Sequence, residues 1–205
     1  MSTRAITFAL LTSLPMLTAG CGDVTQGPSP SVVRITLLEA ASGAAPDKYG
    51  GTLNSDVITV VKRNSVDVST VFNDGGRVTM ALALKDPGAP GVTNKPSDLN
   101  VVTFTRYRVE YRRSDGHNVQ GVDVPYAFDS GLTFSVNPDG TVQVGFEIVR
   151  HSAKEEAPLK ALGFTGSLIN TIANVTFFGK DQAGNNVQVT GTIGINFGNF
   201  GDPTS

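Results

Sequence analysis

The chain has 205 residues, of which 40% are hydrophobic and 17% are charged, and its formal net charge is −2. So small an acidic excess gives no electrostatic reason to expect nucleic-acid binding. One cysteine and two histidines are too few for an intramolecular disulfide, and they argue against a structural zinc site.

The N-terminal segment has the pattern of a secretory leader. Arg4 precedes an apolar run from Ala5 to Leu17, and small residues follow this run. The run is too short to span a bilayer stably, whereas its length and charged start are typical of a signal peptide. We therefore predict a signal peptide over residues 1–20.

The end of this leader carries the single cysteine. The segment Leu17-Thr18-Ala19-Gly20-Cys21 resembles the lipobox of bacterial lipoproteins, in which a peptidase cuts before a diacylglyceryl-modified cysteine. The resemblance implies that Cys21 is lipidated and anchors the protein to a membrane surface in the cell envelope. Gly22 follows, and by the same resemblance the outer membrane or cell surface is expected in a diderm host. An ordinary secretory leader with an incidental cysteine is the alternative.

The mature chain is predicted to begin with a flexible tether and to continue as one β domain. Residues 21–30 are polar beyond the cysteine and contain Gly and Pro, as a tether does. Apolar residues then alternate with polar ones, starting at Val33, Ile35 and Leu37, which is typical of strands with one buried face. We predict a single domain over residues 31–200 and a disordered tail over residues 201–205.

Further strands are expected in the first half of the domain. Residues 43–55, rich in Gly, Ala and Pro, are expected to form a loop before a second apolar run from Val57 to Val61. Another alternating run covers residues 78–84, and a Pro- and Gly-rich loop over residues 86–91 follows it. In residues 106–112, Tyr and Val alternate with Arg and Glu, which predicts a strand with one buried and one charged face.

The second half shows two hairpin patterns and one interruption. Residues 132–136 lead through the turn sequence Asn137–Gly140 into a strand over residues 142–148, which predicts a hairpin. Residues 150–172 break the alternation and predict a short crossover helix between sheets. The last hairpin runs from Val175 through a polar turn and returns along odd-numbered apolar residues as far as Phe197.

The stretch from Ala173 to Gly191 resembles the terminal hairpin of bacterial immunoglobulin-like domains, in which D-x-A-G-N forms the turn. In such a turn Asp181 accepts backbone N–H bonds and Gly184 supplies the left-handed residue. The chain as a whole is similar to bacterial lipoproteins with one such domain. The pattern predicts an all-β, immunoglobulin-like antiparallel sandwich of about seven to nine strands with one short crossover helix. A closed β-barrel is the alternative, and fold alone says little about function.

No catalytic motif is visible, so we predict no catalytic residue and no cofactor. His117 and His151 fit surface positions better than a general base. Calcium binding fits this sequence better than catalysis does, because loops at the ends of a sandwich can supply oxygen ligands. The candidate calcium ligands are Asp181, Asn185 and Asn186, or Asp115, Asp123 and Asp129. The alternative is that these side chains only shape turns.

Two surface features could bind a partner. The basic residues Arg106, Arg108, Arg112 and Arg113 could contact an acidic polysaccharide or lipid headgroups, or could be a solvated strand face with carboxylates opposite. Tyr49 and Tyr126 are candidate carbohydrate platforms. The sequence thus predicts a membrane-anchored envelope lipoprotein with a non-enzymatic structural or interaction sandwich. Its partners would be the membrane, through Cys21, and an envelope protein or polysaccharide. A carbohydrate- or calcium-dependent binding or adhesion module is the alternative.

Overall fold

The computed structural model describes residues 30–86, 88–91 and 94–201. The predicted signal peptide, Cys21 with nearly all of the predicted tether, and residues 202–205 of the predicted tail lie outside the described residues. The described residues therefore comprise the β domain.

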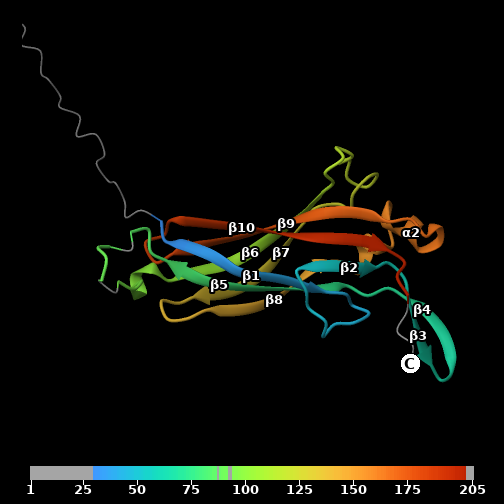
Figure 1. The fold of residues 1–205 in the computed structure, drawn as a ribbon, viewed down its shortest axis with the longest axis horizontal. Helices are drawn as coiled ribbons and strands as arrows, with labels where there is room; N and C mark the ends of the chain where they lie inside the picture. Colours follow the sequence, from blue (N-terminus) through green and yellow to red (C-terminus); the bar gives the residue numbers. More distant parts are fainter. Residues whose placement is uncertain (1–29, 87, 92–93, 202–205) are drawn as a thin grey trace, which may run out of the picture.

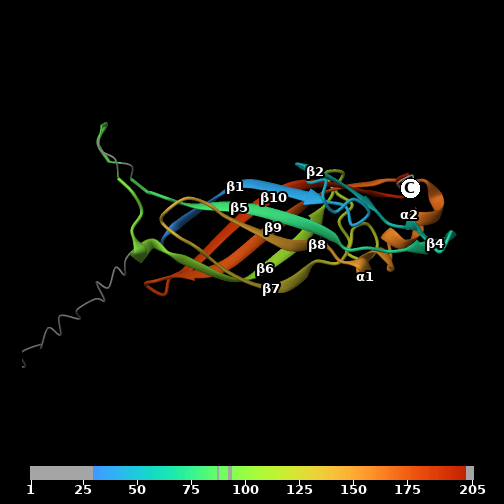
Figure 2. The same ribbon diagram turned by 90° about the horizontal axis from the view of Figure 1, so that it is seen from below.

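Two packed sheets form the domain, which confirms the predicted all-β sandwich (Figures 1 and 2). The smaller sheet has the antiparallel strand order β1 (Val32–Ala41), β5 (Asp74–Ala83) and β8 (Val142–Val149). The larger sheet has the order β2 (Thr52–Asp56), β10 (Asn186–Gly198), β9 (Ile169–Asp181), β6 (Val102–Arg112) and β7 (Phe128–Val136). Strands β2 and β10 run parallel, and the other pairs of this sheet are antiparallel.

The remaining elements are short. Strands β3 (Thr59–Arg63) and β4 (Val66–Thr70) form a separate hairpin, and η1 (Asp98–Asn100) is a single 3₁₀ turn. Helices α1 (His151–Lys154) and α2 (Leu159–Thr165) connect β8 in one sheet to β9 in the other. Figures 1 and 2 show that β1 starts at one end of the long axis, whereas α2 and the β3–β4 hairpin lie at the opposite end.

Aromatic side chains fill the space between the sheets. Phe177 of β9 is fully buried, and its ring lies 5.5 Å from that of Phe146 and 6.1 Å from that of Tyr107, measured between centroids. Phe104 and Phe134 also pack against it, with centroids 6.4 and 6.2 Å away. Because aromatic rings bury large areas and prefer such tilted contacts, this cluster joins strands of both sheets.

The last hairpin forms as the sequence predicts. Strands β9 and β10 pair from Asn186 opposite Lys180 to Phe197 opposite Ile169, with an unbroken register. On β10, Val187, Ile193 and Phe197 are buried in the core, so its odd-numbered apolar side chains do share the inner face.

The predicted hairpin around Asn137–Gly140 is wrong. Strand β7 belongs to the five-stranded sheet and β8 to the three-stranded one, so the turn crosses from one sheet to the other. Gly140 has the expected positive φ of 84°. Two strands that pair in one sheet and two strands that face each other across a core show the same alternation of apolar residues. The alternation therefore could not show that β7 and β8 lie in different sheets.

Strand boundaries differ from the prediction in the first third of the domain. Strand β2 occupies the end of the expected loop over residues 43–55 and extends to Asp56. The run from Val57 to Val61 is divided, because β3 begins only at Thr59. Strand β2 has Leu53 as its only large apolar residue, so it gave no periodic signal. The β3–β4 hairpin was not predicted; its turn places Asn64 and Ser65 at positive φ.

Two smaller corrections concern β1 and the crossover. A bulge between Ile35 and Leu37 shifts the register, so Leu37 is 46% exposed instead of lying in the core. The single predicted crossover helix is two short helices, and its expected range ends too late, because β9 already begins at Ile169. Leu159 and Leu162 of α2 pack into the core.

Candidate functional site

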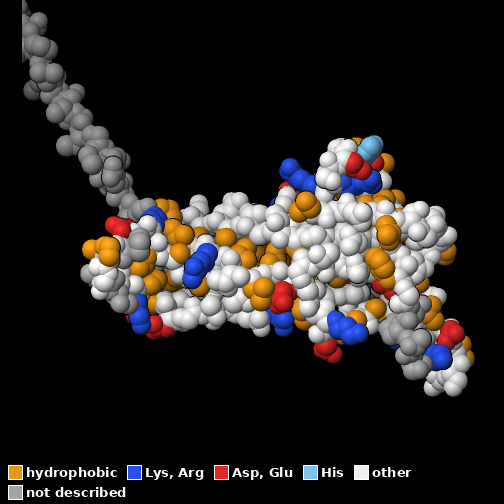
Figure 3. Space-filling model, in the orientation of Figure 1, with side chains coloured by type: hydrophobic (Ala, Val, Ile, Leu, Met, Phe, Trp, Pro, Cys, Tyr) orange, Lys and Arg blue, Asp and Glu red, His pale blue; other side chains and the backbone are white. Residues whose placement is uncertain are grey.

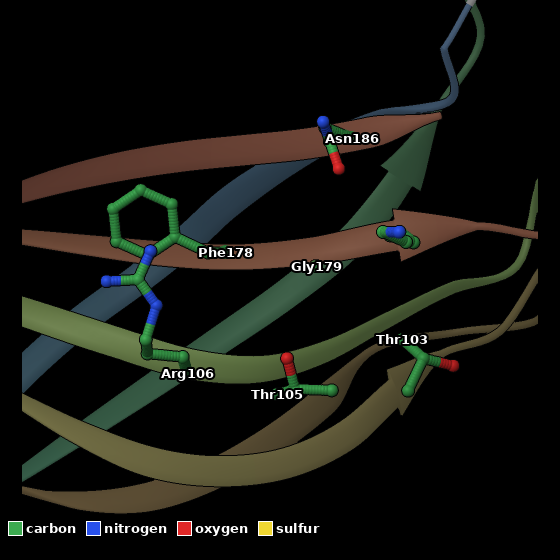
Figure 4. A pocket seen from close by; sticks show the side chains of 7 residues that line it. Thr103, Thr105, Arg106, Phe178, Gly179 and Asn186 are labelled. Atoms are coloured by element: carbon green, nitrogen blue, oxygen red, sulfur yellow. The ribbon is translucent and has the colours of Figure 1, made fainter. Parts of the chain in front are cut away.

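An open groove of about 530 Å³ lies on the outer face of the five-stranded sheet. Strands β6, β9 and β10 line it with Thr103, Thr105, Arg106, Phe178, Gly179, Lys180 and Asn186 (Figure 4). The groove lies near the end of the sandwich at which the described chain begins, because Ser31 N donates a hydrogen bond to the carboxylate of Asp181 at 3.0 Å. Its lining combines hydroxyl, amide and cationic groups with one aromatic ring.

A β-bulge in β6 shapes this groove. Phe104 pairs with Gly179 of β9, and Arg106 pairs with Phe178, so Thr105 is an additional residue with no partner in the ladder. A bulge reverses the alternation of side chains along a strand. Thr105 and Arg106 are therefore both exposed on the outer face.

The Arg106 side chain is held against the ring of Phe178. Its guanidinium carbon lies 3.9 Å from the ring centroid (Figure 4). Its Nη1 atom is 2.5 Å from the carboxylate of Asp129 on β7. A guanidinium stacked on a ring and paired with a carboxylate is restrained in position. The groove therefore has one wall made of a cation stacked on an aromatic ring, with Thr105 beside it on β6 (Figure 4).

Gly179 lies on the floor of the groove, where the backbones of β6 and β9 leave no room for a side chain. A Cβ atom there would lie 2.4 Å from the carbonyl oxygen of Thr103 and 2.9 Å from Cα of Phe104. We expect Gly179→Ala to lower the free energy of unfolding by about 1–3 kcal/mol, because the two backbones must separate. Gly131→Ala on neighbouring β7 is the matched control, since its Cβ would meet nothing within 4 Å. Urea unfolding of both variants measures the difference, and equal stabilities would contradict this description of the groove floor.

The arginine residues predicted from sequence are mostly neutralised by carboxylates. Arg108 contacts Glu110 at 2.8 Å and shares Asp129 with Arg106, while Arg113 pairs with Asp115. Arg112 ends β6 with an exposed side chain. This arrangement matches the solvated strand face with carboxylates opposite, and it leaves little excess positive charge for a polyanion.

The first set of candidate calcium ligands lies in the β9–β10 turn. The carboxylate of Asp181 accepts hydrogen bonds from Ser31 N, Ala183 N, Asn185 N and the Asn185 side chain, at 2.9–3.0 Å. These hydrogen bonds outweigh the effect of burial and lower the pKa of Asp181. Gly184 takes a φ of 84° there, as predicted. A cation would have to displace several of these N–H donors, so the geometry favours the structural role in the turn.

The second set is spread over separate local contacts. Asp115 pairs with Arg113, which lowers its pKa to about 2, and Asp123 accepts the backbone N–H of Val119. Asp129 lies instead between Arg106 and Arg108. Across residues 30–86, 88–91 and 94–201, no three His, Cys, Asp or Glu side chains are close enough to hold a metal ion.

The other candidate residues lie apart from the groove. His117 belongs to the loop between β6 and β7, which projects from the sandwich and carries charged side chains (Figure 3). His151 starts α1 with an exposed side chain. Tyr49 is stacked under Arg77 with a separation of 4.0 Å, and Tyr126 is 53% exposed in the β6–β7 loop.

A buried polar cluster near α1 was not predicted from sequence. Lys154 Nζ lies 2.8 Å from Asp74 Oδ1 and 2.8 Å from the backbone oxygen of Asp56. Asp74 also accepts bonds from Ser55 Oγ at 2.6 Å and Gly43 N at 2.8 Å. Burial raises the pKa of Asp74, and Lys154 opposes that rise. The sequence offered one sign of this cluster, the lysine at position 154 in the region that interrupts the alternation, and by sequence this lysine cannot be told from a surface lysine.

No protein-family model and no curated protein matches the sequence of this chain. Within the part of the chain that the structure describes, no helix combines the length and apolar character that a membrane span requires. The groove, the buried cluster and the sequence features of the N-terminal segment are therefore the basis for assigning a function.

Proposed function

We propose that this protein is a membrane-anchored lipoprotein of the cell envelope whose sandwich is a non-enzymatic interaction module. The open groove on the outer face of the five-stranded sheet carries the proposal, because a cation and an aromatic ring are stacked there beside hydroxyl and amide side chains. The lipobox-like segment that ends at Cys21 supports the anchoring, and the terminal hairpin supports a relation to bacterial immunoglobulin-like domains.

The groove lies near the point where the described chain begins, a few residues after the proposed anchor at Cys21. A tether over residues 21–30 could extend about 35 Å at most, since a stretched chain gains at most about 3.6 Å per residue. The groove lies at the end of the sandwich where this tether joins it. A ligand of the groove would therefore be an envelope component close to the membrane.

The chemistry of the groove favours a polysaccharide as this ligand. Thr103, Thr105 and Asn186 supply side chains that both donate and accept hydrogen bonds, as sugar hydroxyls require. The edge of Phe178 supplies apolar contact beside the planar donors of Arg106. Arg106 is already paired with Asp129, so Lys180 is the cation of the lining that a glycan would meet, and a neutral or weakly acidic glycan fits better than a strongly acidic one.

A glycan-binding experiment tests this proposal. The full-length protein would be screened on an array of bacterial envelope glycans, and the hits would be titrated by calorimetry with and without calcium. We expect Phe178→Ala to weaken binding about tenfold or more, which corresponds to about 1.4 kcal/mol. Tyr126→Ala is the matched control, because this exposed aromatic residue lies in the β6–β7 loop outside the groove lining. Absence of glycan binding, or equal affinity in Phe178→Ala, would contradict the groove as a polysaccharide site.

A further inference from the structure

The buried pair of Asp74 and Lys154 joins two segments that are far apart in the sequence. Asp74 begins β5 in the three-stranded sheet, and Lys154, 80 residues later, ends α1 on the path to the other sheet. Their side chains are 0% and 1% exposed, and Nζ lies 2.8 Å from Oδ1. The chain has one cysteine, so no intramolecular disulfide can fix these segments together.

The surroundings of Lys154 suit an amide nitrogen better than an ammonium group. An ammonium carries three N–H donors, and the hydrogen bonds described for Nζ go to two acceptors, Asp56 O and Asp74 Oδ1. Burying both charges also removes their hydration. An amide is uncharged and has a single N–H, for which the Asp56 carbonyl is an acceptor already in place.

We propose that Lys154 and Asp74 condense to an intramolecular isopeptide bond between Nζ and Cγ. The ammonium first passes one proton to Oδ1, which leaves a neutral amine beside a neutral carboxylic acid. The amine lone pair attacks Cγ, and the N–C bond forms. A second proton moves from nitrogen to Oδ1, the C–Oδ1 bond breaks, and water leaves. The ammonium and the carboxylate together become one amide and one water molecule, with no oxidant or reductant required.

The surroundings of Asp74 assist the proton transfer and the attack on Cγ. Ser55 Oγ donates to Oδ2 at 2.6 Å, so it can stabilise the negative charge that develops on this oxygen during attack and then hydrogen-bond to it as the amide carbonyl. Burial favours the neutral acid and amine over the ion pair. The fold also holds the lysine nitrogen against the carboxyl group. The entropy cost of bringing the two groups together is therefore already met by folding and does not add to the barrier of the condensation.

The bond would connect the start of β5 to the segment that leads from one sheet to the other. It would close a loop that contains β5, β6, β7 and β8, so these strands could not separate fully from one another on unfolding. This is the effect that a disulfide has in other extracellular domains. It would act without a thiol.

A tryptic peptide map of the purified full-length protein tests the proposal. Trypsin does not cleave after an acylated lysine, so a formed bond joins the peptide of residues 64–77 to that of residues 151–160. The expected product is a branched peptide whose mass is the sum of the two less one water, and its fragments place the link at Asp74 and Lys154. Free peptides 64–77, 151–154 and 155–160 without the branched product would overturn the proposal.

The variant Lys154→Arg is the control for this map. Arginine keeps the positive charge but does not offer the amine nucleophile, and trypsin cleaves after it. The branched product is expected to be absent from this variant. Its presence would show that the link involves another residue, which would also overturn the proposal.

Discussion

Lys154→Met is expected to lower the free energy of unfolding by about 3–5 kcal/mol at neutral pH, because it leaves the Asp74 carboxylate buried without a cation. Both the ion pair and the proposed amide need the Lys154 amine, so the variant loses whichever of the two the wild-type protein contains. Methionine has a similar length to the lysine stem, which limits the loss of packing. Chemical unfolding followed by circular dichroism measures the change.

The loss in Lys154→Met should depend on pH. Burial already raises the pKa of Asp74 above its ordinary value of 3.8, and removal of the lysine takes away a contact that lowers it. A carboxyl group with a raised pKa in the folded state destabilises the fold progressively as pH rises from its unfolded pKa through its folded pKa. The variant should therefore be closest to the wild type at acidic pH and fall behind as pH rises.

Lys160→Met is the matched control for this variant. Lys160 lies on α2 with an exposed side chain, only six positions further along the chain. Its replacement should change the free energy of unfolding by no more than about 0.5 kcal/mol. A similar small effect for Lys154→Met, or a loss that grows toward acidic pH, would contradict the role given to the buried pair.

Phe177→Ala is the second large expected effect. Phe177 has no exposed surface and contacts the rings of Phe104, Tyr107, Phe134 and Phe146. Removing it leaves a cavity between the sheets, and we expect a loss of about 3–5 kcal/mol in the free energy of unfolding.

The adjacent Phe178 provides a control of the same residue type. Its ring is on the outer face of the sheet and stacks against Arg106, so Phe178→Ala should cost at most about 1 kcal/mol. The two variants thus separate stability from glycan binding, since Phe178→Ala is the one expected to lose affinity. Equal destabilisation by both substitutions would contradict the description of Phe177 as pointing into the core and of Phe178 as pointing to the outer face of the sheet.

The hairpin of β9 and β10 could be predicted well, because two physical signals agree there. The apolar residues of β10 share one face, and Asp181 with Gly184 specifies the turn between the strands. The all-β sandwich followed from the same alternation elsewhere. Strand β2 was missed because its pairing with β10 depends on distant backbone groups and not on its own apolar residues.

The groove could have been located in part from the sequence. Val102 and Phe104 point inward on even numbers, whereas Tyr107, Val109 and Tyr111 point inward on odd numbers. This change of parity marks the bulge at Thr105. The position of Phe178 and Asn186 beside it depends on strand order and register, which alternation does not determine.

The buried cluster could not have been predicted, because it depends on contacts between remote segments. Asp74 and Asp56 are in strands that belong to different sheets, and Lys154 reaches them from a four-residue helix. Lysine is almost never fully buried unless it is paired, so a single sequence favours a surface position for it. Only the fold brings these groups together.

The proposed role at a membrane depends on the lipid anchor, which mass spectrometry of the N-terminal peptide of the protein from its native host tests directly. We expect this peptide to begin at Cys21 and to carry the added mass of a diacylglyceryl group. A peptide that contains Cys21 without an acyl group, or that continues upstream into residues 1–20, would contradict the proposed anchor.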